Sequence, residues 1–170
     1  WEHLQKEGKS RFSLEPMDTA YLGPAFSQKD VQVALEKSGI AARHRVIPIA
    51  NVDDVAARLA EGQIIGRCAG RMEFGLRALG NRSILADPRR HETVRKINAA
   101  IKYRDFWMPF TPTILAECQN EYITNPKGLL SPFMSMAFDS TPRARRELTA
   151  AMHPADFTVR PQILERSQNP

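Results

Sequence analysis

The stretch "GRMEFGLRALGNRS", Gly70–Ser83, contains three glycines, three arginines and an asparagine within fourteen residues. Glycine lets backbone N–H groups approach an anion closely, which suggests a phosphate-binding loop. Gly75 and Gly80 have the spacing of a P-loop, but Asn81-Arg82-Ser83 replaces its Lys-Ser/Thr, which excludes a Walker A motif. The glycine spacing alone therefore favours a turn-rich connector.

The polar side chains of this stretch favour anion binding more strongly than its glycines do. Arginine presents a planar fork of donors to phosphate or carboxylate, and asparagine and serine add neutral polar groups. The candidate ligands are Arg71, Arg77, Asn81, Arg82 and Ser83. The alternative is that these arginines lie on a solvated face or pair with Glu73 and Asp87.

A second basic element is "KYR", Lys102–Arg104. In an extended segment Lys102 and Arg104 would share one face, but such a triplet occurs on any basic surface and does not by itself indicate a site. The aromatic residues Phe106, Trp107 and Phe110 follow, and they predict apolar walls or core. Near the end of the chain, Asp156 and Arg160 either orient a ligand or pair across a strand.

Charge is concentrated in one block of the chain. Residues 71–104 contain nine Lys/Arg against three carboxylates, a net charge of +6, so the remainder sums to −1 in a chain of net charge +5. Such a block attracts nucleic acid, phosphorylated small molecules or an acidic partner.

The patterning predicts one domain of α/β class, with α+β as a possibility. Ser27 and Asp30 form a capping box before a helix that ends at Gly39, and Asn51 caps a second helix. A third helix is expected over residues 93–102. Strands are expected at residues 44–50, 64–70, 83–87, 109–117, 132–138 and 158–164.

Composition excludes several classes of protein. No apolar run approaches the roughly 20 residues that cross a bilayer. Two cysteines and four histidines show neither a disulfide framework nor metal-ligand spacing, so we predict no metal site and a cytoplasmic location. The start at Trp1 without Met leads us to expect a piece of a longer chain.

The motifs taken together resemble a known family. "GRMEFGLRALGNRSILADPR", "INAAIKYRDFWMPFTPTIL", "SPFM" and "DFTVRPQ" are similar to the C-terminal, YrdC-like domain of O-carbamoyltransferases of the NodU/NolO/CmcH group. The resemblance implies a YrdC-like mixed twisted sheet with flanking helices, incomplete at its C-terminus. It divides the chain into a lead-in, 1–20, from a preceding domain or linker, and a partial carbamoyltransferase C-terminal domain, 21–170.

Members of this family resemble two-domain enzymes that transfer a carbamoyl group from carbamoyl phosphate to a substrate hydroxyl. The resemblance implies that ATP, with Mg²⁺, forms a carbamoyl-adenylate in the YrdC-like half, and that an actin-like half with a metal centre completes the transfer. Lys102 and Arg104 match the K-x-R element of YrdC-like proteins, so the resemblance implies that both contact phosphate. Leu76 replaces a proline and Met108 an arginine of many members.

The family pattern continues past Asn169-Pro170 into an "NTSFN" segment, so we expect this fragment to be inactive alone. Two other functions remain open. An RNA-binding module would use the basic block, although only Phe74 and Tyr103 supply aromatic rings within it. A non-catalytic domain that docks the actin-like half is the third interpretation.

Overall fold

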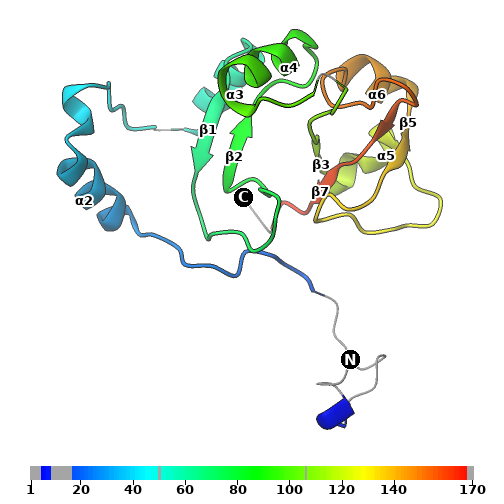
Figure 1. The fold of residues 1–170 in the computed structure, drawn as a ribbon, viewed down its shortest axis with the longest axis horizontal. Coiled ribbons are helices and arrows are strands. Elements are labelled where there is room, and N and C mark those ends of the chain that lie inside the picture. Colours follow the sequence, from blue (N-terminus) through cyan, green and yellow to red (C-terminus); the bar gives the residue numbers. More distant parts are fainter. Residues whose placement is uncertain (1–4, 9–16, 50, 106, 168–170) are drawn as a thin grey trace.

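The computed structural model describes residues 5–8, 17–49, 51–105 and 107–167. Helices alternate with short strands in mixed sheets, which confirms the α/β class (Figure 1). The helices are α2 Gln28–Ser38, α3 Val52–Ala60, α4 Glu92–Ile97, α5 Gln119–Tyr122 and α6 Pro142–Glu147, with helical turns η2 Ile40–Ala42, η3 Asn98–Lys102 and η4 Ala116–Cys118.

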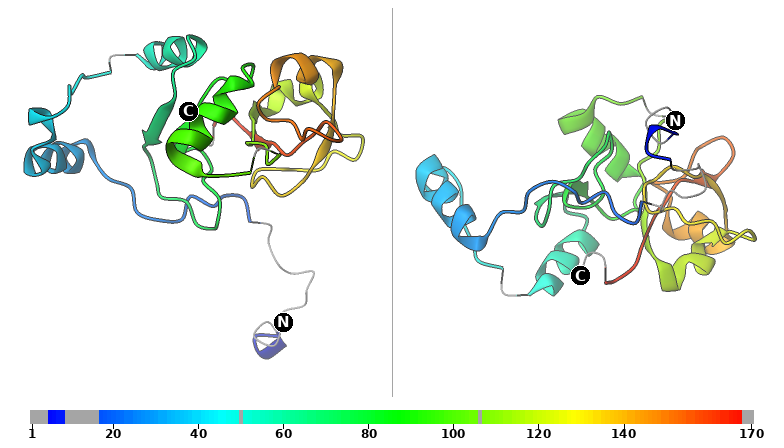
Figure 2. Two further views of the ribbon diagram at one scale, coloured as in Figure 1. Left: turned by 45° about the horizontal axis from the view of Figure 1, so that its top comes forward. Right: turned by 90° about the horizontal axis from the view of Figure 1, so that it is seen from below.

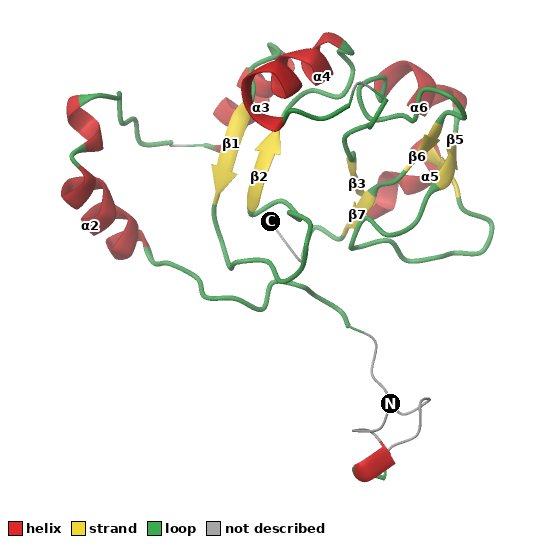
Figure 3. Cartoon of the chain, in the orientation of Figure 1, coloured by secondary structure: helices red, strands yellow, loops and turns green. Residues whose placement is uncertain are grey.

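The described strands form three small sheets in place of one continuous twisted sheet (Figure 3). β1 Ile65–Cys68 is antiparallel to β2 Arg82–Leu85, with Cys68 opposite Arg82. β3 Thr113–Leu115 is parallel to β7 Gln162–Leu164. The third sheet has the antiparallel order β4 Ile123–Thr124, β5 Phe138–Ser140 and β6 Thr158–Val159. The stretch 70–83 therefore connects two adjacent strand ends.

The main hydrophobic core lies in the second half of the chain. It joins β3 and β7 to the three-stranded sheet and α6, and its buried members are Ile114, Ile123, Phe138, Ala144, Leu148, Ala151, Val159 and Ile163. Burial of these aliphatic side chains stabilises the fold by roughly 1.5–3 kcal/mol for each large one. All of these core residues belong to the second half of the chain.

Helix α2 begins as the sequence predicts but projects from the body. Ser27 Oγ accepts from the Asp30 amide while Asp30 accepts from the Ser27 amide, and Gly39 ends the helix in the left-handed conformation. None of its residues is buried, and all three ribbon views show it apart from the sheets (Figures 1 and 2).

Two strand predictions are wrong, and a third strand is divided. Residues 44–49 form no strand, since Pro48 lacks an amide donor and Val46, Ile47 and Ile49 stay exposed. Residues 132–137 form a loop in which Met134 has a φ of 57°. Pro161 interrupts the last strand, so β6 and β7 join different sheets.

Among the described residues, no helix has both the length and the apolar character to cross a membrane. Residue 50, at the end of the first strand prediction, lies outside the described residues.

Candidate functional site

Glu73 closes the loop between β1 and β2. One of its carboxylate oxygens, Oε1, accepts hydrogen bonds from the backbone N–H groups of Leu79, Asn81 and Arg82, at 2.8, 2.6 and 3.4 Å. The Gly80 amide donates instead to Ser83 Oγ at 2.9 Å. The amides of residues 79–82 are therefore bonded inside the loop and are not offered to an anion.

Residues 20–24 fasten the other side of this loop. The amide of Phe74 donates to Ala20 O, and Met72 exchanges backbone hydrogen bonds with Gly23 and Pro24. Tyr21 Oη donates to Leu79 O at 2.7 Å, and the same carbonyl accepts from buried Gln162 on β7 at 2.9 Å. The loop is thus tied both to residues 20–24 and to the C-terminal core.

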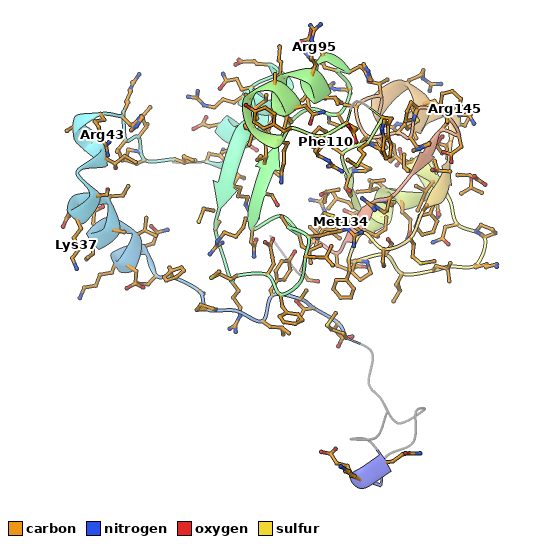
Figure 4. All side chains as sticks on the ribbon, in the orientation of Figure 1. Lys37, Arg43, Arg95, Phe110, Met134 and Arg145 are labelled. Carbon is orange, nitrogen blue, oxygen red and sulfur yellow. The ribbon has the colours of Figure 1, made fainter. Side chains whose placement is uncertain are left out.

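A cavity of about 440 Å³ lies between the β1–β2 half and the C-terminal core. Its apolar wall includes Ile97, Phe110 and Met134, and the latter two are labelled in Figure 4. Its basic residues are Arg77, Arg82, Lys102, Arg104 and Arg160, and its one carboxylate is Asp87. This volume is in the usual range for small-molecule sites.

Asp87 does not neutralise these basic residues, because it forms an ion pair with Arg89. Arg89 donates to both Asp87 oxygens at 2.8–3.1 Å, and these hydrogen bonds hold the pKa of the buried carboxyl below its usual range. In the described part of the chain, Arg77, Lys102 and Arg160 have no carboxylate within ion-pair distance. The cavity therefore has an uncompensated positive charge.

Arg160 is a partly buried cation of this cluster, and its pKa is shifted. Burial, followed by the positive charges of Arg77 and Arg104, lowers the pKa of its guanidinium from the ordinary value. The side chain lies at the break between β6 and β7 that Pro161 causes. Asp156 instead contacts His153 and Thr158, so the predicted pairing of Asp156 with Arg160 is absent among the described residues.

Lys102 and Arg104 both line the cavity, although their segment is not extended as the sequence analysis assumed. Lys102 ends the π-helical turn η3, and Tyr103 follows in the left-handed conformation. Arg104 stacks over the Phe110 ring, 5.2 Å from its centroid, and contacts Met108 Sδ. Trp107 is half-exposed, and Phe106 lies outside the described residues.

The predicted ligands of the loop divide into two groups. Arg77, Arg82 and Ser83 line the cavity, whereas Arg71 and Asn81 do not. Arg71 donates hydrogen bonds to the Tyr21 and Leu22 carbonyls. The side-chain amide of buried Asn81 donates to Arg71 O and accepts from Arg67. Arg82 also donates to the carbonyls of Ala69 and Asn81, so part of its donor capacity supports the loop.

Sequence reasoning missed the position of Arg160 beside Arg77 and Arg104. The signal was "VRPQ", in which a proline interrupts a strand directly after an arginine. Met134 gave no comparable signal in the sequence, and it lines the cavity with a left-handed backbone.

A second cavity, of about 300 Å³, shares Asp87, Pro88 and Thr113 with the first. Its polar groups are paired: Tyr122 Oη donates to Glu147 at 2.8 Å, which raises the pKa of Tyr122 and lowers that of Glu147. It offers no charge excess like that of the first cavity, which is therefore the better candidate site.

Comparison with known proteins agrees with the motifs. The family model described as "Carbamoyltransferase C-terminus" matches residues 56–170. The chain is 38% identical over 159 residues to the uncharacterised protein MJ1058 of Methanocaldococcus jannaschii, covering 92% of this chain and 26% of that protein. It is 44% identical over 128 residues to nodulation protein NolNO of Sinorhizobium fredii, covering 72% and 19%.

Nodulation protein NolO of Bradyrhizobium diazoefficiens is 40% identical over 129 residues, which cover 73% of this chain and 23% of NolO. The chain spans about a quarter or less of the length of these curated relatives. Because the family model covers more than half of the chain, the chain belongs to the carbamoyltransferase C-terminal family.

Proposed function

We propose that this chain is the part of an ATP-dependent O-carbamoyltransferase that binds carbamoyl phosphate and ATP. The observation that supports this proposal is the cluster of Arg77, Lys102, Arg104 and Arg160 around one cavity, which has a single, already paired carboxylate. Carbamoyl phosphate and the triphosphate of ATP are anions of the kind that such a cluster attracts.

The reaction would bring two anionic reactants together. Water would first cleave carbamoyl phosphate into carbamate and inorganic phosphate. A carbamate oxygen would then form a bond to the α-phosphorus of ATP while the bond to the β-phosphate oxygen breaks, so that pyrophosphate leaves and carbamoyl-adenylate forms. Positive side chains would offset the charge repulsion between the reactants and the charge on the leaving pyrophosphate. Transfer to the hydroxyl of a nodulation factor, antibiotic or similar acceptor would occur in a separate, actin-like domain of the parent protein.

Mg²⁺ would enter this site together with the nucleotide. Among the described residues, no group of three or more His, Cys, Asp or Glu side chains could hold a metal ion. The cavity residues suit phosphate oxygens and not a cation, because Asp87 is engaged by Arg89. Phosphate oxygens and water would then supply the ligands of the ion.

Calorimetric titration of the 170-residue chain with carbamoyl phosphate, and with ATP plus Mg²⁺, tests this proposal. We expect saturable binding that Lys102→Ala or Arg160→Ala weakens by about tenfold or more, since each removes a charged donor. Arg95→Ala is the matched control, because Arg95 is exposed on α4 and outside the cavity (Figure 4). Equal weakening by Arg95→Ala would indicate attraction by net charge alone.

The parent protein provides the catalytic test. Arg77→Ala and Lys102→Ala should each reduce carbamoyl-phosphate-dependent ATP–pyrophosphate exchange, with unchanged thermal unfolding. Wild-type exchange in both variants would refute the assignment of these residues, and an absence of exchange in the wild-type parent would refute the proposed reaction.

A further inference from the structure

The backbone of Tyr103 has a conformation that its side chain does not explain. Its φ and ψ are 43° and 47°, in the left-handed region, where a residue other than glycine costs roughly 1–2 kcal/mol. The side chain is 91% exposed. No hydrogen bond of the phenol group is present among the described residues, so nothing bound to the ring offsets this cost.

The turn before Tyr103 is also unusual. The residues Asn98–Lys102 form a π-helical turn, and the amide of Tyr103 donates to Asn98 O, five residues earlier, at 3.1 Å. The Asn98 Oδ1 atom is buried and has no hydrogen-bond partner in the described part of the chain. Single π-helical turns and left-handed non-glycine residues both concentrate at functional sites.

These two features determine where the neighbouring cations lie. If α4 continued as an α-helix, residues two apart would not face one another, so Lys102 and Arg104 would diverge. The left-handed residue at position 103 instead ends the helical path between them. Both cations line the same cavity while the ring between them extends into solvent.

We propose that Tyr103 is a positioning residue, whose left-handed backbone after the π-helical turn brings Lys102 and Arg104 together to hold one phosphate group. This inference rests on the proposed function in one respect: the phosphate group would belong to carbamoyl phosphate or ATP. A second non-glycine residue with positive φ, Met134, lines the same cavity.

The test uses a series of substitutions that differ in backbone preference, with inorganic pyrophosphate as the calorimetric probe. Tyr103→Phe should bind as the wild type does, and Tyr103→Asn should bind equally or a few-fold more tightly, because asparagine tolerates the left-handed region. Tyr103→Ile should weaken binding by about tenfold, since β-branched residues are disfavoured there. Leu130→Ile, at a residue that is 85% exposed, controls for a general effect of branching.

A double substitution separates positioning from folding. If Tyr103 acts through Lys102, then Tyr103→Ile should cost much less affinity in a Lys102→Ala background than in the wild type. If Tyr103→Ile does not fold, the comparison of Tyr103→Asn with Tyr103→Ala replaces it. Both lack the ring, and the alanine variant should bind several-fold more weakly.

The outcomes distinguish the two proposals. Equal pyrophosphate affinity across the folded variants, or no pyrophosphate binding by the wild type, would overturn the positioning role. If pyrophosphate follows the expected order while carbamoyl phosphate does not bind, the proposed function fails and the role of Tyr103 stands.

Discussion

At the scale of single residues, arginines in this chain have two different functions, and the partner within reach decides which. Arg71 and Arg82 donate to backbone carbonyls and fasten the loop, whereas Arg77 and Arg160 face a cavity without a carboxylate partner among the described residues. Burial, followed by the positive charges of Arg77 and Arg104, lowers the pKa of Arg160. A bound anion would offset the repulsion between these charges.

Asp87 leads to a prediction about pH. Hydrogen bonds from Arg89 lower its pKa below the ordinary value of about 3.9. Because the folded-state pKa is the lower one, the ionised carboxyl contributes stability that is fully present above about pH 5 and is lost as the pH falls below about 4. The melting temperature of the wild type should therefore fall more steeply between pH 5 and pH 3 than that of Asp87→Asn.

Circular-dichroism melts across this range make the measurement. Glu92→Gln is the control, because its pair with Lys96 is exposed on α4 and solvent screens it. If the melting temperatures of the wild type and Asp87→Asn fall in parallel with pH, the ionised Asp87 carboxyl does not contribute the expected stability.

The residue types of the site could be predicted from the sequence, but their partners could not. An arginine-rich loop indicates anion binding in general. The hydrogen bonds that engage Asn81 depend on the course of residues 71–82 in space. Arg160 reaches Arg77 only because β6 and β7 belong to different sheets, which no local pattern specifies.

At the scale of elements, the loop depends on close contact with residues 20–24, which predicts opposite effects for two glycines. A Cβ on Gly23 would lie 2.6 Å from Met72 Cβ, whereas a Cβ on Gly66 in β1 would meet nothing within 4 Å. Gly23→Ala should lower the free energy of unfolding by about 1–3 kcal/mol. Gly66→Ala should be neutral or stabilising, because alanine reduces the entropy of the unfolded chain.

Urea unfolding followed by tryptophan fluorescence would measure both variants. A Gly23→Ala protein as stable as Gly66→Ala would mean that residues 20–24 do not hold the loop in solution.

Local signals predicted those elements that local chemistry determines. The capping box of α2 and the strands on either side of the loop were confirmed. Residues 44–49 are rich in branched side chains, yet a strand requires a neighbouring edge, and none pairs with them in the described structure. The division of the last strand required knowledge of which sheets surround Pro161.

At the scale of the whole molecule, the concentration of charge predicts how binding responds to salt. A small anion in one cavity replaces few counterions, so pyrophosphate affinity should fall by less than about tenfold between 50 and 200 mM salt. Single-stranded RNA held by six or more phosphate contacts would lose roughly a thousandfold over this range. Parallel calorimetric titrations with both probes would make the comparison.

A tight RNA complex with the steep salt dependence, together with weak pyrophosphate binding, would favour the nucleic-acid interpretation. The arrangement of the cations favours the small anion, because they line one cavity.

Glu73 has a further consequence for how a ligand would be received. Its carboxylate occupies three backbone donors near the end of the loop, so this part of the loop contains its own internal acceptor. The polypeptide can then adopt its final path before any substrate arrives. Recognition is left to side chains on a preorganised frame, and induced fit of the main chain is unnecessary.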